Sequence, residues 1–135
     1  MRTSATDWAL LLLRVGFAAL MLLLHGGPRA VRAFEHIFSG QPWGFVGVVE
    51  RLGFPYPLVF ALLSTAAESL GVLSVGLGIW TRLAAAVVAM NLVVAVWNEG
   101  IGGDSFELPA VYLVMACSLV LAGGGRLTLP RLLGR

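Results

Sequence analysis

The amino-acid sequence predicts an all-α membrane protein: a four-transmembrane-helix bundle with both termini cytoplasmic and a short interfacial helix in the first outer loop. Of the 135 residues, 59% are hydrophobic and only 12% are charged, whereas soluble globular proteins carry about 25% charged residues. The apolar residues form uninterrupted runs and do not alternate with polar ones, which excludes the strands of a membrane β-barrel. The length suits one domain, so we expect 1–135 to form a single membrane domain.

Four apolar segments approach the roughly 20 residues that a helix needs to cross about 30 Å of hydrocarbon. The predicted spans are 8–24, 57–80, 82–97 and 106–122. The first is too long for an ordinary signal peptide and no small-residue cleavage site follows it, so we interpret it as a retained helix. The second and third are joined by "WTR", which makes them adjacent and antiparallel.

The ends of the first and fourth spans carry helix-ending signals. Thr6 or Asp7 is expected to cap the first helix, since a short side-chain oxygen accepts from free backbone N–H groups. "HGGP" after Leu24 is expected to end it, because glycine tolerates left-handed backbone and proline cannot continue a helix. "GGG" at 123–125 is expected to end the fourth. Residues 25–56 then form the outer loop.

Orientation follows from the arginines, because cytoplasmic loops are enriched in basic residues. The side that holds both termini and the second loop carries five of them: Arg2, Arg82, Arg126, Arg131 and Arg135. The opposite side carries three in its long loop, and its other loop is acidic. In the long loop, "WGFVGVVERLGF" (43–54) spaces its apolar residues by three, which indicates a short amphipathic helix on the outer membrane surface.

Composition also limits the function. A net charge of +2 is too small for nucleic-acid binding, and a single cysteine, Cys117, excludes an internal dithiol redox mechanism. There is no GxGxxG dinucleotide fingerprint and we predict no metal site. His25 and His36, eleven residues apart across the "GGP" break, form only a weak candidate pair of axial haem ligands.

Polar groups inside the spans need a structural or functional explanation, because a mid-bilayer charge costs about 2.5–3.5 kcal/mol on insertion scales. The candidates are Arg14, Glu68 and Asn91, with His25 and Glu107 near the outer ends. At 1.5 Å rise per residue, Arg14 lies about 9 Å above the cytoplasmic boundary, Asn91 about 14 Å, Glu68 about 18–20 Å and His25 about 25 Å. Small residues flank Glu68, so we expect it to face the bundle.

The spacing of small and polar residues along the spans indicates that the helices share a polar interior. On the third span, small or polar residues form a stripe: Ala84, Val88, Asn91, Ala95 and Asn98. A direct Arg14–Glu68 pair stays open, because helix side chains lean toward the N-terminus and these two would lean apart. The alternatives are snorkelling of Arg14, a protonated Glu68 that locks the bundle, an interhelical hydrogen bond for Asn91, and interfacial solvation of His25 and Glu107.

Several short motifs, in order, resemble the DoxX family of small four-helix bacterial membrane proteins. They are "LLLRVGFAALMLLLHG", a "G-x-P" entry, "AE-x-x-G", "G-x-x-T-R", an internal "MN", and "FELP" followed by "GGGRLTL". The resemblance covers about Leu11 to Leu129 and implies a four-helix bundle in the bacterial inner membrane, associated with quinone-linked oxidoreductase complexes. The positions it carries over are Arg14, His25, Glu68, Arg82, Asn91 and Glu107. The first loop departs from the family's short "HG-x-x-K" form.

Together these observations predict a multi-pass subunit of a redox system that uses a quinone and acts with a partner membrane or peripheral oxidoreductase. Glu68 and His25 are the candidate catalytic residues, since quinone reduction needs a proton donor near the oxygens. The candidate ligand-binding residues are Arg14, Asn91, Glu107 and Trp97. The alternatives are a non-catalytic structural or assembly subunit, and a small proton-coupled transporter. A homo-oligomer is compatible with the same sequence.

Overall fold

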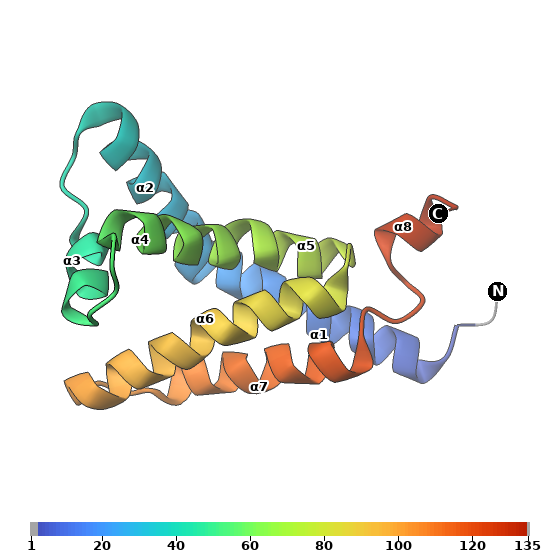
Figure 1. Ribbon diagram of the computed structural model, residues 1–135. Coiled ribbons are helices and arrows are strands. Elements are labelled where there is room, and N and C mark those ends of the chain that lie inside the picture. The colour runs from blue at the N-terminus through green and yellow to red at the C-terminus, as the bar shows by residue number, and fades with distance from the viewer. Residues whose placement is uncertain (1–2, 135) are drawn as a thin grey trace.

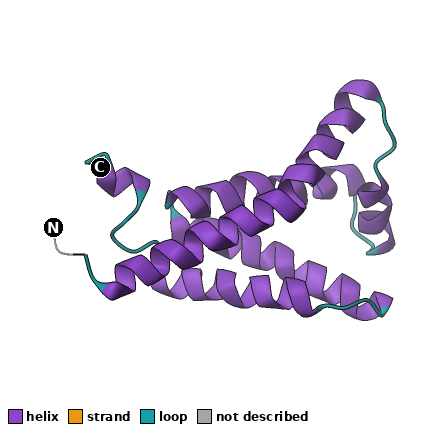
Figure 2. Ribbon diagram, turned by 180° about the vertical axis from the view of Figure 1, so that it is seen from behind, coloured by secondary structure: helices purple, strands orange, loops and turns teal. Residues whose placement is uncertain are grey.

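A computed structural model describes residues 3–134, which form helices and no strands (Figures 1 and 2). Arg2 and Arg135, which the orientation prediction counts, lie outside the described residues. The elements are α1 (Ala5–Met21), the π-helical η1 (Leu22–Gly26), α2 (Gly27–Ser39), α3 (Gly44–Arg51), α4 (Pro57–Ala66), the π-helical η2 (Ala67–Gly71), α5 (Val72–Leu77), α6 (Thr81–Gly102), α7 (Glu107–Ala122) and α8 (Leu129–Leu132).

Three continuous helices are long and apolar enough to cross a membrane: Ala5–Ser39, Pro57–Leu77 and Thr81–Gly102. α7 has 16 residues, about 24 Å of helix, and packs along α6 in the same bundle (Figure 1). The prediction of an all-helical membrane protein is confirmed. The first turn of α1 and the short α8 lie at the same end of the bundle (Figure 1).

The predicted end of the first helix at "HGGP" is wrong, because the helix continues to Ser39. An α-helical Pro28 would clash with the carbonyl of the residue four before it. η1 removes that conflict, since the Gly27 N–H bonds to the Leu22 carbonyl five residues back and Pro28 falls in the first turn of α2. The helix ends only at Gly40, whose φ is 65°. Residues 25–39 are therefore helical and not part of a loop.

The two π-helical segments pack directly against each other. A side chain at Gly26 would overlap the Glu68 backbone carbonyl, so only glycine permits this approach. η1 and η2 each insert a residue into the α-helical ladder of their spans, as π-bulges do. Their contact brings His25 and Glu68 to the same level of the bundle.

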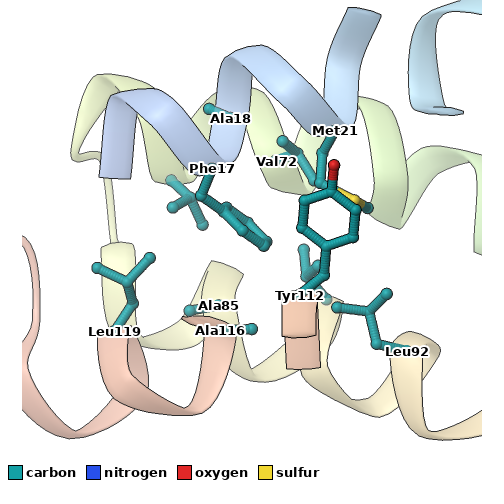
Figure 3. Close-up of a cluster of buried hydrophobic side chains, with 11 residues drawn as sticks. Phe17, Ala18, Met21, Val72, Ala85, Leu92, Tyr112, Ala116 and Leu119 are labelled. Carbon is teal, nitrogen blue, oxygen red and sulfur yellow. The ribbon is translucent and has the colours of Figure 1, made fainter. Parts of the chain in front are cut away.

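The main core lies below this contact, toward the α1 start. Phe17 and Met21 of α1 meet Tyr112 of α7 there, and the Phe17 and Tyr112 rings meet edge to face with centroids 5.9 Å apart (Figure 3). Val72 and Val88 complete the contact from α5 and α6. Apolar side chains from all four helices therefore hold the bundle together.

A second cluster holds α3 against α2 and α4. Trp43 and Val49, from the predicted amphipathic segment, are buried with Ala33 of α2 and Ala61 of α4. The helix predicted within 43–54 is confirmed as α3, and its apolar residues face protein. Its position at the membrane surface stays a prediction.

Arg14 ties the C-terminal segment to the bundle. Its guanidinium is 2% exposed and donates to the carbonyl of Gly124 at 3.1 Å and to that of Leu127. Gly78 leaves room for it, since a Cβ there would overlap Arg14 Nη1. The open Arg14–Glu68 pair is therefore not formed, because Arg14 leans toward the α1 start and meets backbone oxygens there.

The α1 start is capped by Ser4, two or three residues earlier than the predicted Thr6 or Asp7. Ser4 Oγ accepts from the Asp7 N–H at 3.2 Å, and Asp7 accepts in return from the Ser4 N–H at 2.9 Å, which is a capping box. Asp7 also accepts from the Arg126 N–H at 3.1 Å. α7 ends at "GGG" as predicted, with Gly123 at φ 77°.

The Gly26 contact predicts a steep cost for one methyl group. G26A should destabilise the protein by about 1–3 kcal/mol, because the new carbon overlaps rigid backbone of η2. Thermal unfolding in detergent, followed by circular dichroism, measures this. G16A is the matched control on the same helix, since a Cβ at Gly16 meets nothing within 4 Å. Equal midpoints for both variants would contradict the packing of η1 on η2.

The Arg14 contacts predict that R14M releases the C-terminal segment. The two lost hydrogen bonds from a charged group are worth about 1.5–3 kcal/mol each. Hydrogen–deuterium exchange of residues 123–128 should therefore speed up in R14M. R131M, which alters an exposed arginine of the same region, should leave it unchanged. Unaltered exchange in R14M would show that Arg14 does not anchor this segment.

Candidate functional site

Buried Glu68 lies at the centre of a polar cluster with Arg29 and Asn91, which are half-buried. Glu68 is 4% exposed. The Asn91 Nδ2 donates to its Oε1 at 2.7 Å, and Arg29 Nη1 lies 2.7 Å from its Oε2. Arg29 and Glu68 therefore form an ion pair, although among the described residues no donor is aligned for a hydrogen bond to Oε2. The cluster thus joins α2, η2 and α6, and the prediction that Glu68 faces the bundle is confirmed.

The local chain explains how Glu68 is presented. In η2 the regular i→i−4 ladder is interrupted, and Val72 N–H reaches back to the Ala67 carbonyl. Hydroxyl groups bond the preceding turn, with Thr65 Oγ1 donating to Ala61 O at 2.8 Å and Ser69 Oγ to Thr65 O at 2.6 Å. Such bonding to the i−4 carbonyl gives each hydroxyl a partner within the apolar helix and often bends the helix locally.

Arg29 is held from two sides. Its side chain is 27% exposed, and its guanidinium carbon lies 4.1 Å from the ring centroid of Phe45 on α3. This distance is typical of a cation–π contact. Phe45 of α3 and the carboxylate of Glu68 therefore both hold Arg29 in the cluster.

A cavity of about 420 Å³ opens beside the cluster, between α3, α4, η2 and α6. The polar groups Arg29, Glu68, Asn91, Asn98 and Glu99 line one part of it. The remaining wall is almost entirely apolar: Phe45, Val48, Val49, Leu52, Phe54, Phe60, Leu63, Ala67, Val87, Met90, Val94 and Ala95, with Ser64. We call it the larger cavity. Its size and its few convergent polar groups are typical of small-molecule sites.

A smaller cavity of about 150 Å³ lies on the other side of Glu68. Its polar lining consists of His25, Arg29, Glu68, Glu99, Ser105 and Tyr112, and its apolar lining of Met21, Leu92, Ala95, Leu108 and Pro109. The His25 and Tyr112 rings meet edge to face with centroids 5.6 Å apart. Because Arg29, Glu68, Ala95 and Glu99 line both cavities, the Arg29–Glu68 pair lies between them.

The structure brings together three of the predicted site residues, Glu68, His25 and Asn91. The other three lie elsewhere. Arg14 binds the C-terminal segment, Glu107 is exposed in the first turn of α7, and Trp97 is 65% exposed. Neither Glu107 nor Trp97 is among the described residues that line the two cavities. Of the predicted α6 stripe, Asn91, Ala95 and Asn98 line the larger cavity.

Sequence reasoning missed Arg29, Glu99 and Tyr112. Arg29 follows His25 by four residues, which puts both on one helix face, but the expected break at "GGP" hid this spacing. Glu99 follows the predicted stripe of α6 by one residue, where the span was expected to have ended. Tyr112 is the one phenol inside the predicted fourth span.

The haem alternative is wrong for a pair within one chain. His25 and His36 lie on one continuous helix, where eleven residues correspond to about 16 Å of rise. Both rings cannot then bind one iron. His36 Nδ1 instead lies 2.7 Å from the Gln41 carbonyl.

Arg82, which the resemblance carries over, lies at the opposite end of the bundle from the polar cluster. Its Nη2 donates to the Leu121 carbonyl at 3.2 Å, and so binds one of the last carbonyls of α7. Cations near a helix C-terminus are favourable because they oppose its dipole. Arg82 therefore has a contact that supports the bundle end.

Comparison with protein families matches residues 9–98 to DoxX. No curated protein and no solved structure gave a significant match. The matched segment is two thirds of the chain and contains His25, Arg29, Glu68 and Asn91. With the apolar spans above, this match shows that the chain is a multi-pass membrane protein of the DoxX family.

Proposed function

We propose that this protein is the integral membrane subunit of a quinone-linked redox system and acts with a partner oxidoreductase in the bacterial inner membrane. The observation that carries the proposal is the Arg29–Glu68–Asn91 cluster, centred on buried Glu68, at the wall of a mostly apolar cavity. A quinone has the matching chemistry, with polar carbonyl oxygens on an apolar ring and tail. Arginine placement supports cytoplasmic termini, and the shared end of α1 and α8 fits an even number of spans.

The lining of the larger cavity fits a quinone head group. Arg29 carries several N–H donors and Asn91 carries an NH₂ group, both suited to carbonyl oxygens. Phe45, Phe54 and Phe60 supply flat apolar walls for the ring, and aromatic contacts of this kind add to area burial. The polar groups set the orientation of the ligand, while the apolar walls supply most of its affinity.

Glu68 is the group that moves protons in this proposal. A bound quinone supplies two-electron redox chemistry, in which its two oxygens take up two protons; the electrons come from the partner oxidoreductase. Protonated Glu68 can donate its proton toward the cavity, and Arg29 favours the carboxylate that remains. General acid–base groups of this kind contribute typically 10²–10⁴-fold in rate.

A structural or assembly subunit is the second candidate, and one observation favours it. The cluster satisfies much of its own charge and hydrogen bonding across α2, η2 and α6, as an interhelical lock does. On this reading Glu68 needs no ligand. The two candidates differ in what they require of the carboxylate, namely proton transfer or only a hydrogen bond.

Filling the larger cavity should block quinone binding. Val94 lines it, so V94F should weaken binding of a short-chain ubiquinone by at least about tenfold, or 1.4 kcal/mol. Quenching of tryptophan fluorescence in detergent measures the affinity. V93F is the matched control, since Val93 is 54% exposed and is not among the lining residues. Wild-type affinity in V94F, or none in the unaltered protein, would contradict the proposal.

Removing the carboxylate separates the two candidates. E68Q and the neutral pair E68Q/R29Q keep hydrogen-bonding groups, and the pair avoids an unmatched buried charge. Proton transfer by Glu68 predicts that the native complex carrying either variant loses about 10²–10⁴-fold in quinone reduction. A lock predicts that the double variant retains both thermal midpoint and activity. Intact folding with lost reduction therefore favours the redox subunit.

A further inference from the structure

Two buried polar atoms point to the contents of the smaller cavity. His25 Nε2 is buried and has no hydrogen-bond partner among residues 3–134, and buried Glu68 Oε2 has the Arg29 ion pair but no aligned hydrogen bond there. Both residues line this cavity. Buried polar atoms are bonded in the large majority of cases, and water commonly supplies the bond when protein does not. These two atoms therefore have room for further hydrogen bonds, which a polar occupant between η1 and η2 would supply.

The smaller cavity suits water. At about 30 Å³ per molecule, its 150 Å³ hold roughly five waters. Each water needs two to four polar partners, and six lining residues carry polar side chains. Tyr112 reaches across the bundle from α7 with its hydroxyl pointing toward α1 (Figure 3).

The smaller cavity also extends toward bulk solvent. Ser105, in the turn between α6 and α7, lines it and is exposed, and Glu99 is half-buried. Leu108 beside them is 49% exposed. The exposed Ser105 and Leu108 therefore put the mouth of the cavity at this turn. On its far side, the cavity ends at the Arg29–Glu68 pair, which also borders the larger cavity.

We propose that the smaller cavity is a hydrated proton-exchange chamber, in which His25 and Glu68 exchange protons through water and the Arg29–Glu68 pair separates this water from the larger cavity. The charged or titratable groups around His25 are Arg29 of α2, Glu68 of η2, Glu99 of α6 and Tyr112 of α7. The final destination of the proton rests on the proposed quinone function, whereas the chamber itself does not.

The proposed step transfers a proton and involves no electron transfer. The Nε2–H bond of the His25 imidazolium breaks, the proton passes along water, and an O–H bond forms at Glu68 Oε2. Glu68 is then neutral, so its attraction for Arg29 falls and its proton is available to the larger cavity. Once that proton leaves, the ion pair forms again. His25 regains a proton from water at the α6–α7 turn.

The chamber is tested on the protein alone, without quinone. In ¹⁵N-histidine NMR of protein in nanodiscs, with H25N identifying the signal, the His25 ring N–H should exchange rapidly with water. L108W, which fills the chamber mouth, should slow this exchange by about tenfold or more. V111W is the matched control, since Val111 is 56% exposed on the same helix. S105W repeats the block from the turn.

A His25 ring N–H that does not exchange with water, or exchange that both blocking variants leave unchanged, would overturn the chamber. In the native complex, H25Q should lower quinone reduction by about 10²-fold with unchanged quinone affinity. Full reduction in H25Q would also overturn the proposal. If His25 exchange is fast and blocked as expected but no quinone binds, the chamber stands and the proposed function fails. If quinone binds but the His25 N–H does not exchange with water, the proposed function stands and the chamber fails.

Discussion

The burial of one carboxylate at the contact of two π-helical segments constrains most of this structure. A charge inside the bilayer is costly, and Glu68 is neutralised by Arg29 and hydrogen-bonded by Asn91. Arg29 can reach Glu68 only if the first helix continues through "GGP". That continuation needs the π turn at η1 to accommodate Pro28, and glycine at position 26 to let η1 touch η2. One ion pair therefore depends on the conformation of two helices.

The two ends of the bundle use arginine in different ways. At the η1–η2 end Arg29 balances a carboxylate and lies over an aromatic ring. At the end that holds the chain termini, Arg14 and Arg82 donate to backbone carbonyls of the α7 end and the segment after it. The planar guanidinium offers five donors and is weakly hydrated compared with an ammonium. These properties suit the contacts of Arg14, Arg29 and Arg82.

The two cavities differ in polarity, and the polar cluster borders both of them. The larger is mostly apolar and is bounded by α3 and the aromatic residues near it, which suits a lipid-soluble ligand. The smaller has a high proportion of polar lining and reaches the surface at the α6–α7 turn. Glu68 borders both, so a proton and an apolar ligand can approach the same carboxyl from opposite sides. α3, which holds Arg29 in place, couples the segment between α2 and α4 to this arrangement.

The sequence by itself determined the fold class, the approximate starts of the long apolar helices, and the burial of Glu68. These depend on apolar length and on the cost of charge in lipid, both of which are local properties. Only the tertiary structure decided which groups Arg29 and Arg14 contact. Arg29 belongs to Glu68 because packing of η1 on η2 overrides the helix-breaking tendency of Gly-Gly-Pro, and Arg14 binds carbonyls 110 and 113 residues away. Backbone acceptors carry no residue-type signal, and a π turn depends on what packs against it, so neither could be predicted from residue spacing.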